Sequence, residues 1–116
     1  MLSCLGMAKP KHDVLQGTLT LLVLQSLSRG PLHGYGITSF VEQASEELLR
    51  VEEGSLYPAL HRMEEEGLIQ AEWGVTETNR KARFYSLTPS GVERLETEKD
   101  HWRRLTLGVG KVLQYA

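Results

Sequence analysis

Three short groups of side chains have the residue types and spacing needed to bind phosphates and the edges of bases. The cations Arg80, Lys81 and Arg83 follow a polar stretch, and such a segment can bind phosphates or a narrow minor groove. The hydroxyls of Ser55 and Tyr57 stand at the start of a predicted helix, where N–H groups and the helix dipole favour an anion. These two groups predict contacts with phosphates and, if the helix enters a groove, with base edges.

The third group lies at the start of an earlier predicted helix, where a tyrosine hydroxyl and exposed N–H groups can hold one phosphate. Pro58 gives the later helix a rigid entry, and His61 and Arg62 follow one turn on. The residues expected to contact DNA are therefore His33, Tyr35, Gly36, Ser55, Tyr57, Pro58, His61, Arg62, Arg80, Lys81 and Arg83.

Each group also has an ordinary structural interpretation. His33 could be only a turn residue and Tyr35 only a packed side chain. Ser55 could serve only as an N-cap and Tyr57 only as a packed side chain. Arg62 could pair with Glu65 or Glu66 along its own helix instead of reaching a phosphate or a guanine. The cations could be no more than solvated strand charges. The sequence leaves these alternatives open.

Hydrophobic spacing predicts the elements that would position these groups. Ser55 is expected as the N-cap of the third helix, with Pro58 in its first turn, and Thr88 as the N-cap of the last. In the connector before the third helix, Leu48 and Val51 are expected in the core. The predicted helices span residues 14–27, 34–44, 55–66 and 89–116, and the predicted strands span 68–73 and 81–87.

The last predicted helix carries an apolar heptad seam, which favours pairing with a second copy of the chain. Glu98 interrupts the seam, and Gly108 and Gly110 soften it. Trp73, near the base of the hairpin, is expected to pack. The predicted dimer-interface residues are Leu95, Trp102, Leu105, Val109 and Val112.

Composition bounds the function. The net charge is −2 and the sequence pI about 6.1, so any binding to nucleic acid must come from a local patch. One cysteine and no apolar run of the ~18 residues of a membrane span predict a cytoplasmic protein. The four histidines lack metal-ligand spacing. Gly54-Ser55-Leu56 lacks the following glycine of a nucleophile elbow. We therefore expect no metal, no cofactor and no enzyme.

Several motifs together resemble the PadR-type transcriptional regulators, in the family's order across residues 15–91. The resemblance implies a winged helix-turn-helix with a single C-terminal dimerisation helix, a homodimeric repressor and a palindromic operator. It also implies that a small hydrophobic or aromatic ligand could release the DNA, with two Trp102 side chains flanking the pocket. The motifs are Leu15-Gln16-Gly17-Thr18-Leu19, Gly30-Pro31-Leu32-His33-Gly34-Tyr35-Gly36-Ile37, Gly54-Ser55-Leu56-Tyr57-Pro58-Ala59-Leu60, Glu64-Glu65-Glu66-Gly67-Leu68-Ile69 and Arg83-Phe84-Tyr85-Ser86-Leu87-Thr88-Pro89-Ser90-Gly91.

The fold class predicted is mainly α with a small β-hairpin. Residues 1–13 are expected to form a flexible tail, 14–88 the winged-helix DNA-binding unit and 89–116 the dimerisation helix. The alternative function is a winged-helix module that contacts proteins and has no operator of its own. The cations around residues 80–83 favour binding to DNA, whereas the negative net charge of the chain keeps the alternative open.

Overall fold

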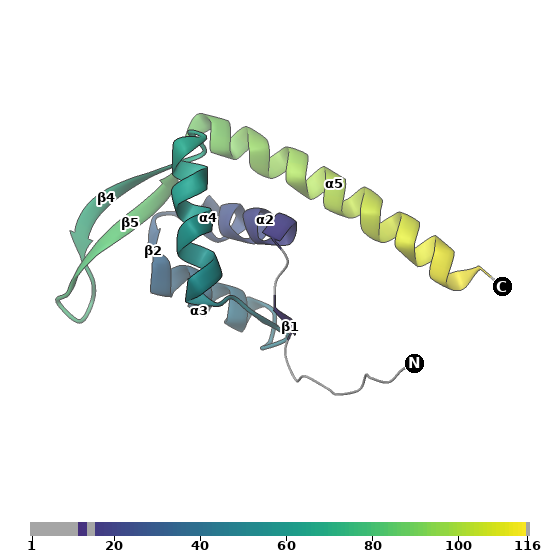
Figure 1. The fold of residues 1–116 in the computed structure, drawn as a ribbon, viewed down its shortest axis with the longest axis horizontal. Coiled ribbons are helices and arrows are strands. Elements are labelled where there is room, and N and C mark those ends of the chain that lie inside the picture. Colours follow the sequence, from purple (N-terminus) through teal and green to yellow (C-terminus); the bar gives the residue numbers. More distant parts are fainter. Residues whose placement is uncertain (1–11, 14–15, 116) are drawn as a thin grey trace.

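The computed structural model describes residues 12–13 and 16–115 (Figure 1). Of the predicted flexible tail, residues 1–11 lie outside the described residues, and the two that follow form a short strand. The elements are β1 (His12–Asp13), α2 (Gln16–Ser26), a 3-10 turn (Leu27–Arg29), β2 (Leu32–His33), α3 (Gly34–Ala44), β3 (Leu49–Arg50), α4 (Glu53–Glu65), β4 (Ile69–Val75), β5 (Lys81–Leu87) and α5 (Pro89–Gln114).

One hydrophobic core holds α2, α3 and α4 together. Leu24 of α2, Ile37 of α3 and Leu60 of α4 are each 1% exposed or less. Ile69 and Tyr85 close the core from the side of the sheet. Burying a large apolar side chain contributes roughly 1.5–3 kcal/mol, so these contacts fix how the three helices are placed.

The sheet has three antiparallel strands in the order β2-β5-β4. The predicted hairpin of β4 and β5 is confirmed, and it runs to Val75, two residues further than expected. The strand β2 was not predicted, because a two-residue strand has too few positions to show alternation. It places His33 beside Phe84 of β5. The end of the hairpin, residues 76–80, forms the tip of the wing (Figure 1).

The start of α4 differs from the prediction. The helix begins at Glu53 with Glu52 as its N-cap, and the Ser55 N–H donates to the Glu52 carbonyl at 3.0 Å. Ser55 is therefore not the N-cap but a residue of the first turn. Pro58 lies inside the helix rather than in the first turn. Proline is tolerated there because the carbonyl it leaves without an N–H partner, that of Gly54, belongs to an exposed residue that water can reach.

The connector before α4 also corrects the prediction. Leu48, expected in the core, is 66% exposed, whereas Val51 is 7% exposed as expected. Glu46 and Glu47 both have positive φ angles and make a tight turn after α3. This turn directs Leu48 into solvent before the chain re-enters the core. The connector also contains a short strand, β3, which pairs in parallel with β1.

The helix α5 starts as predicted. The hydroxyl of Thr88, its N-cap, accepts from the Gly91 N–H at 3.0 Å, and Pro89 occupies the first helical position. Its first turns pack on α2 and β5, and the rest extends away from the body of the molecule (Figure 1). None of the helices in the described part of the chain combines the length and apolar character that crossing a membrane requires.

Candidate nucleic-acid interface

The starts of α3 and α4 meet at one point, where the Tyr57 side chain lies over Gly34. Gly34 is buried, and a Cβ added there would meet the hydroxyl and ring of Tyr57. The glycine therefore provides the space that this tyrosine occupies. Tyr57 nevertheless remains 46% exposed. Two groups of candidate residues that lie far apart in the sequence thus form one surface.

His33 organises the first turn of α3. Its Nδ1 accepts a hydrogen bond from the Gly36 N–H at 3.0 Å, so this nitrogen is unprotonated in the cap. The imidazole ring stacks with Tyr35 at 6.4 Å and meets the edge of Phe84 at 5.2 Å between centroids. The cap uses the Gly36 N–H, which was expected to hold a phosphate. Tyr35, 72% exposed, is the accessible member of this group.

The outer face of α4 is open to solvent. Ser55, Tyr57, Pro58 and His61 are exposed, whereas Arg62 is half-buried at the edge of this face. The inner face of the helix carries the buried residues Leu56, Ala59, Leu60 and Met63. The amphipathic pattern of the helix is therefore as predicted, and it leaves a continuous polar face available for a ligand.

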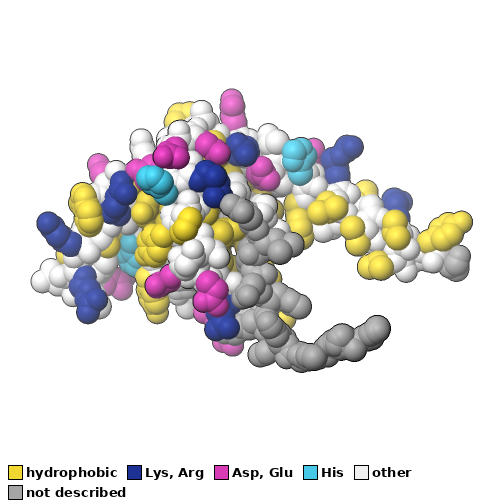
Figure 2. All heavy atoms as spheres, in the orientation of Figure 1, with side chains coloured by type: hydrophobic (Ala, Val, Ile, Leu, Met, Phe, Trp, Pro, Cys, Tyr) yellow, Lys and Arg dark blue, Asp and Glu magenta, His cyan; other side chains and the backbone are white. Residues whose placement is uncertain are grey.

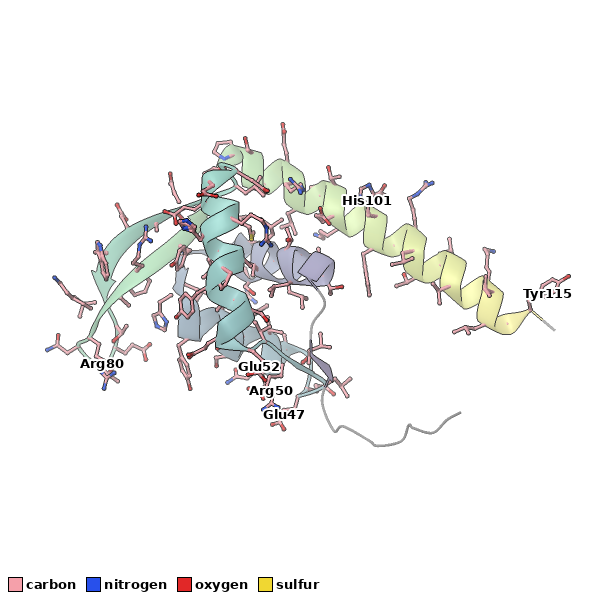
Figure 3. The ribbon with its side chains drawn as sticks, in the orientation of Figure 1. Glu47, Arg50, Glu52, Arg80, His101 and Tyr115 are labelled. Atoms are coloured by element: carbon pink, nitrogen blue, oxygen red, sulfur yellow. The ribbon has the colours of Figure 1, made fainter. Side chains whose placement is uncertain are left out.

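An ion pair lies at the start of α4 and a contact between a histidine and a carboxylate lies near its end. At its start, Arg50 Nε lies 3.3 Å from Glu52 Oε2, and both residues are labelled in Figure 3. Near its end, His61 Nε2 lies 3.3 Å from Glu65 Oε2. These exposed pairs are worth little for stability, but Arg50 offsets a carboxylate beside the helix N-terminus. Within residues 12–13 and 16–115, no cluster of three His, Cys, Asp or Glu side chains could hold a metal.

Two cations stand at the end of the wing. Thr76 and Arg80 close the hairpin, since the Thr76 N–H donates to the Arg80 carbonyl at 2.8 Å and the Thr76 hydroxyl accepts from the Arg80 N–H at 3.1 Å. The Arg80 side chain extends from this tip (Figure 3). Arg80 and Lys81 are exposed, and neither forms an ion pair with a described residue. Both side chains are therefore available to an anionic partner.

Arg83 differs from these two cations because it is tied to α4. Its Nη2 lies 2.8 Å from Glu64 Oε2, and its guanidinium lies 5.7 Å from the centre of the Tyr85 ring. Burial raises the pKa of the Tyr85 phenol, and the nearby Arg83 charge partly offsets that rise. This ion pair links β5 to the end of α4. Local sequence patterns do not predict this pair, because its partners are 19 residues apart.

The second half of α5 exposes an apolar surface (Figure 2). Among the predicted interface residues, Trp102 is 45% exposed and Leu105 is 57% exposed. Leu95 is only 4% exposed, because it packs in the core of its own chain and offers little surface to a partner. In the second half of this helix and just after it, further exposed apolar residues beyond those predicted are Leu107, Leu113 and Tyr115. Among the predicted interface residues, those from Trp102 onward are therefore exposed in the single chain.

The Trp73 side chain was expected to pack against other residues, and that prediction is wrong. The residue is 68% exposed, in the middle of β4. It pairs in register with Arg83 rather than with an apolar side chain.

Comparison with known proteins gives consistent results. The family model described as the transcriptional regulator PadR-like family matches residues 23–97. A 37.1 kDa protein of a Streptomyces fradiae transposon is 41% identical over 83% of this chain. The negative transcriptional regulator PadR of Bacillus subtilis is 30% identical over 66% of this chain. The match spans about 25% of the length of the first relative and 42% of the second.

The fold agrees with a solved structure of the same family. The crystal structure of a PadR-like transcriptional regulator from Bacillus cereus is 30% identical to this chain and has a TM-score of 0.75. The match covers 88% of this chain and 97% of that one. The family match and the shared winged-helix architecture lead to one conclusion: the chain belongs to the PadR-like family of transcriptional regulators.

Proposed function

We propose that the protein is a homodimeric repressor that binds a palindromic operator. In this proposal α4 enters the major groove with its exposed face, and the start of α3 holds the adjoining phosphate through Tyr35. The wing reaches the flanking backbone with Arg80 and Lys81. The observation that carries the proposal is the junction of Tyr57 with Gly34, which joins the two helix starts into one accessible surface.

Local charge supports this assignment. The chain has a net charge of −2, so its overall field does not attract DNA. Arg80 and Lys81 are nevertheless exposed at the wing and have no carboxylate partner among the described residues. Arg83 supports them from the neighbouring position, with its charge offset by Glu64.

The exposed seam of α5 supports dimerisation. Trp102, Leu105, Val109 and Val112 expose apolar surface that a second copy would cover. Two copies related by a two-fold axis read half-sites about one helical turn apart. Repression is supported by the relative from Bacillus subtilis, which is named a negative regulator.

Release by an effector is the further part of the proposal. Two Trp102 side chains, one from each copy, would flank a site for a flat aromatic or hydrophobic molecule. Trp102 is 45% exposed in the single chain, so its indole has a face free for such contacts.

The first experiment selects binders from a pool of random duplexes at about 50 mM and about 200 mM salt. Enrichment of a palindrome with half-sites about one turn apart supports the dimeric repressor. Salt-sensitive binding with no enriched sequence means that the wing binds phosphates but α4 reads little. No binding at either concentration favours the winged-helix module that contacts proteins.

Replacing Arg80, Lys81 and Arg83 together with Ala should weaken binding on all sequences. Each phosphate contact contributes about 0.9 to the slope of log K against log salt. Because Glu64 already offsets Arg83, we expect the slope to fall by about 2 rather than about 3. Fluorescence anisotropy of a labelled duplex across a salt series measures both affinity and slope.

The matched control removes the same charge from α5, by replacing Arg103, Arg104 and Lys111 with Ala. These residues are exposed and lie outside the proposed seam. The control should keep the slope of the natural protein. An unchanged slope and affinity in the wing variant would show that the wing does not contact the backbone.

Replacing Gly34 with Ala should reduce DNA affinity about tenfold, or 1.4 kcal/mol, with a smaller effect on stability. The added Cβ meets the end of the Tyr57 side chain, which can rotate into solvent at modest cost. The phenol then leaves the surface that faces DNA. Anisotropy measures affinity, and thermal unfolding by circular dichroism measures stability.

A double-mutant cycle provides the control. If Gly34→Ala acts through the phenol, it should add little in a Tyr57→Ala background. Independent, additive losses would contradict this explanation, as would full affinity in the Gly34→Ala protein.

A further inference from the structure

The wing has an inner face that the predicted DNA contacts do not fully explain. In the register of β4 with β5, Trp73 lies opposite Arg83 and Val75 lies opposite Lys81. Opposite residues of an antiparallel pair share a face, and residues two apart on a strand share it too. These four residues therefore lie on the same face as Tyr85, which is buried in the core. We call Trp73, Val75, Lys81 and Arg83 the inner wing face.

The inner wing face continues the core side of the sheet beyond the core itself. Tyr85 is 5% exposed, but Trp73 is 68% and Val75 is 61% exposed. The end of the molecule that carries the wing shows apolar side chains interspersed with cations (Figure 2). The seam of α5 lies on the opposite side of the body (Figure 1), so pairing of that seam does not explain this exposure.

Charge indicates what covers this face. Lys81 is exposed and has no ion-pair partner among the described residues. Arg83 pairs with Glu64 at 2.8 Å and lies opposite Trp73 in the strand register. Glu72 of β4, which precedes Trp73 in the sequence, lies on the other face of the hairpin. A partner must therefore offer negative charge next to apolar surface.

A nucleic-acid duplex has this pattern, because its phosphates alternate with apolar deoxyribose edges along each strand. We propose that the inner wing face packs against the sugar-phosphate wall of the groove flanking the operator half-site. Trp73 and Val75 contact the deoxyribose edges, and Lys81 binds the adjoining phosphate. The inference rests on the proposed DNA binding and adds to it an apolar contact made by residues outside the predicted set.

The test uses a 30-base-pair duplex of mixed sequence at low salt, because contacts with the sugar-phosphate wall do not require the operator. Trp73→Ala should lower affinity about tenfold while leaving the salt slope unchanged, since no charge is lost. Lys81→Ala should instead reduce the slope by about 0.9. Anisotropy titrations at several salt concentrations separate the two effects.

Tryptophan fluorescence gives a second readout. Adding the duplex to the natural protein should change its emission, and Trp73→Phe should abolish that change while Trp102 remains. This variant keeps an aromatic ring on the strand, so it tests the contact even if Trp73→Ala destabilises the wing. Gln70→Ala, an exposed position on the other face of β4, is the matched control and should behave like the natural protein.

The outcomes are distinguishable. Full affinity of Trp73→Ala together with an unaltered emission change in Trp73→Phe would overturn the inference and leave the proposed function standing. Absence of duplex binding by the natural protein would overturn both.

Discussion

Leu105→Lys is expected to convert the protein from a dimer into a monomer at micromolar concentration. Leu105 is 57% exposed in the single chain and lies midway along the apolar seam of α5. In the proposed dimer a lysine there would place an ammonium group against apolar side chains of the partner. Burying an unpaired charge costs several kcal/mol, so the dissociation constant should rise about a hundredfold or more.

Sedimentation velocity over a range of concentrations measures this change. The matched control is Thr97→Lys, which adds the same charge to an exposed position of the same helix outside the seam. The control should remain dimeric, and both variants should keep their helix content. A Leu105→Lys protein that sediments as a dimer would rule out the seam as the interface. The monomer should also lose most operator affinity, because a dimer binds two half-sites at once.

The fold could be predicted where a residue acts locally. Thr88 and Pro89 identify the start of α5 because capping and proline placement depend on neighbours within one turn. The same reasoning failed for α4. Ser55 is a good N-cap by type, yet the helix starts two residues earlier, at Glu53. Val51 is buried immediately before it, so the position of the core, which the sequence does not give, decided where the helix begins.

Leu48 and Trp73 show a second limit of the sequence. Both were expected to pack because they are large and apolar, and both are more than 60% exposed. A turn with two positive φ angles directs Leu48 into solvent. Trp73 is exposed because the hairpin extends beyond the core. A hydrophobic pattern predicts which face of an element is apolar, not how far the core extends beneath it.

The candidate site was predicted as a list of residues but not as an arrangement. The Tyr57 contact with Gly34 and the ion pair of Arg83 with Glu64 join separate elements. Such contacts depend on tertiary packing, which residue type and spacing do not encode. They also divide the predicted cations, because Arg83 is held by a carboxylate while Arg80 and Lys81 extend freely.

Gly91→Ala is expected to destabilise the protein by about 2–3 kcal/mol, near the upper end for overpacking a tight contact. The first turn of α5 approaches the turn after α4 so closely that a Cβ on Gly91 would meet the backbone carbonyl of Leu68. That carbonyl already accepts from the Thr88 N–H and hydroxyl, each at 3.1 Å. Neither α5 nor the Leu68 backbone can move easily, because the added Cβ would meet main-chain atoms rather than a flexible side chain. The turn itself is fixed by Gly67 with φ of 76°.

The loss should appear as a lower midpoint in urea and a fall in the melting temperature of about 10 °C, measured at one protein concentration. Gly54→Ala is the matched control, because its Cβ would meet nothing within 4 Å in the first turn of α4. That variant should be unchanged or more stable by up to about 1 kcal/mol. Equal stability of the Gly91→Ala and natural proteins would mean that α5 can shift on Leu68. Because α5 carries the proposed interface, a shifted α5 would also change the spacing of the two α4 helices in the dimer. A Gly91→Ala protein that folds but binds its operator poorly would therefore connect this contact to the geometry of the dimer.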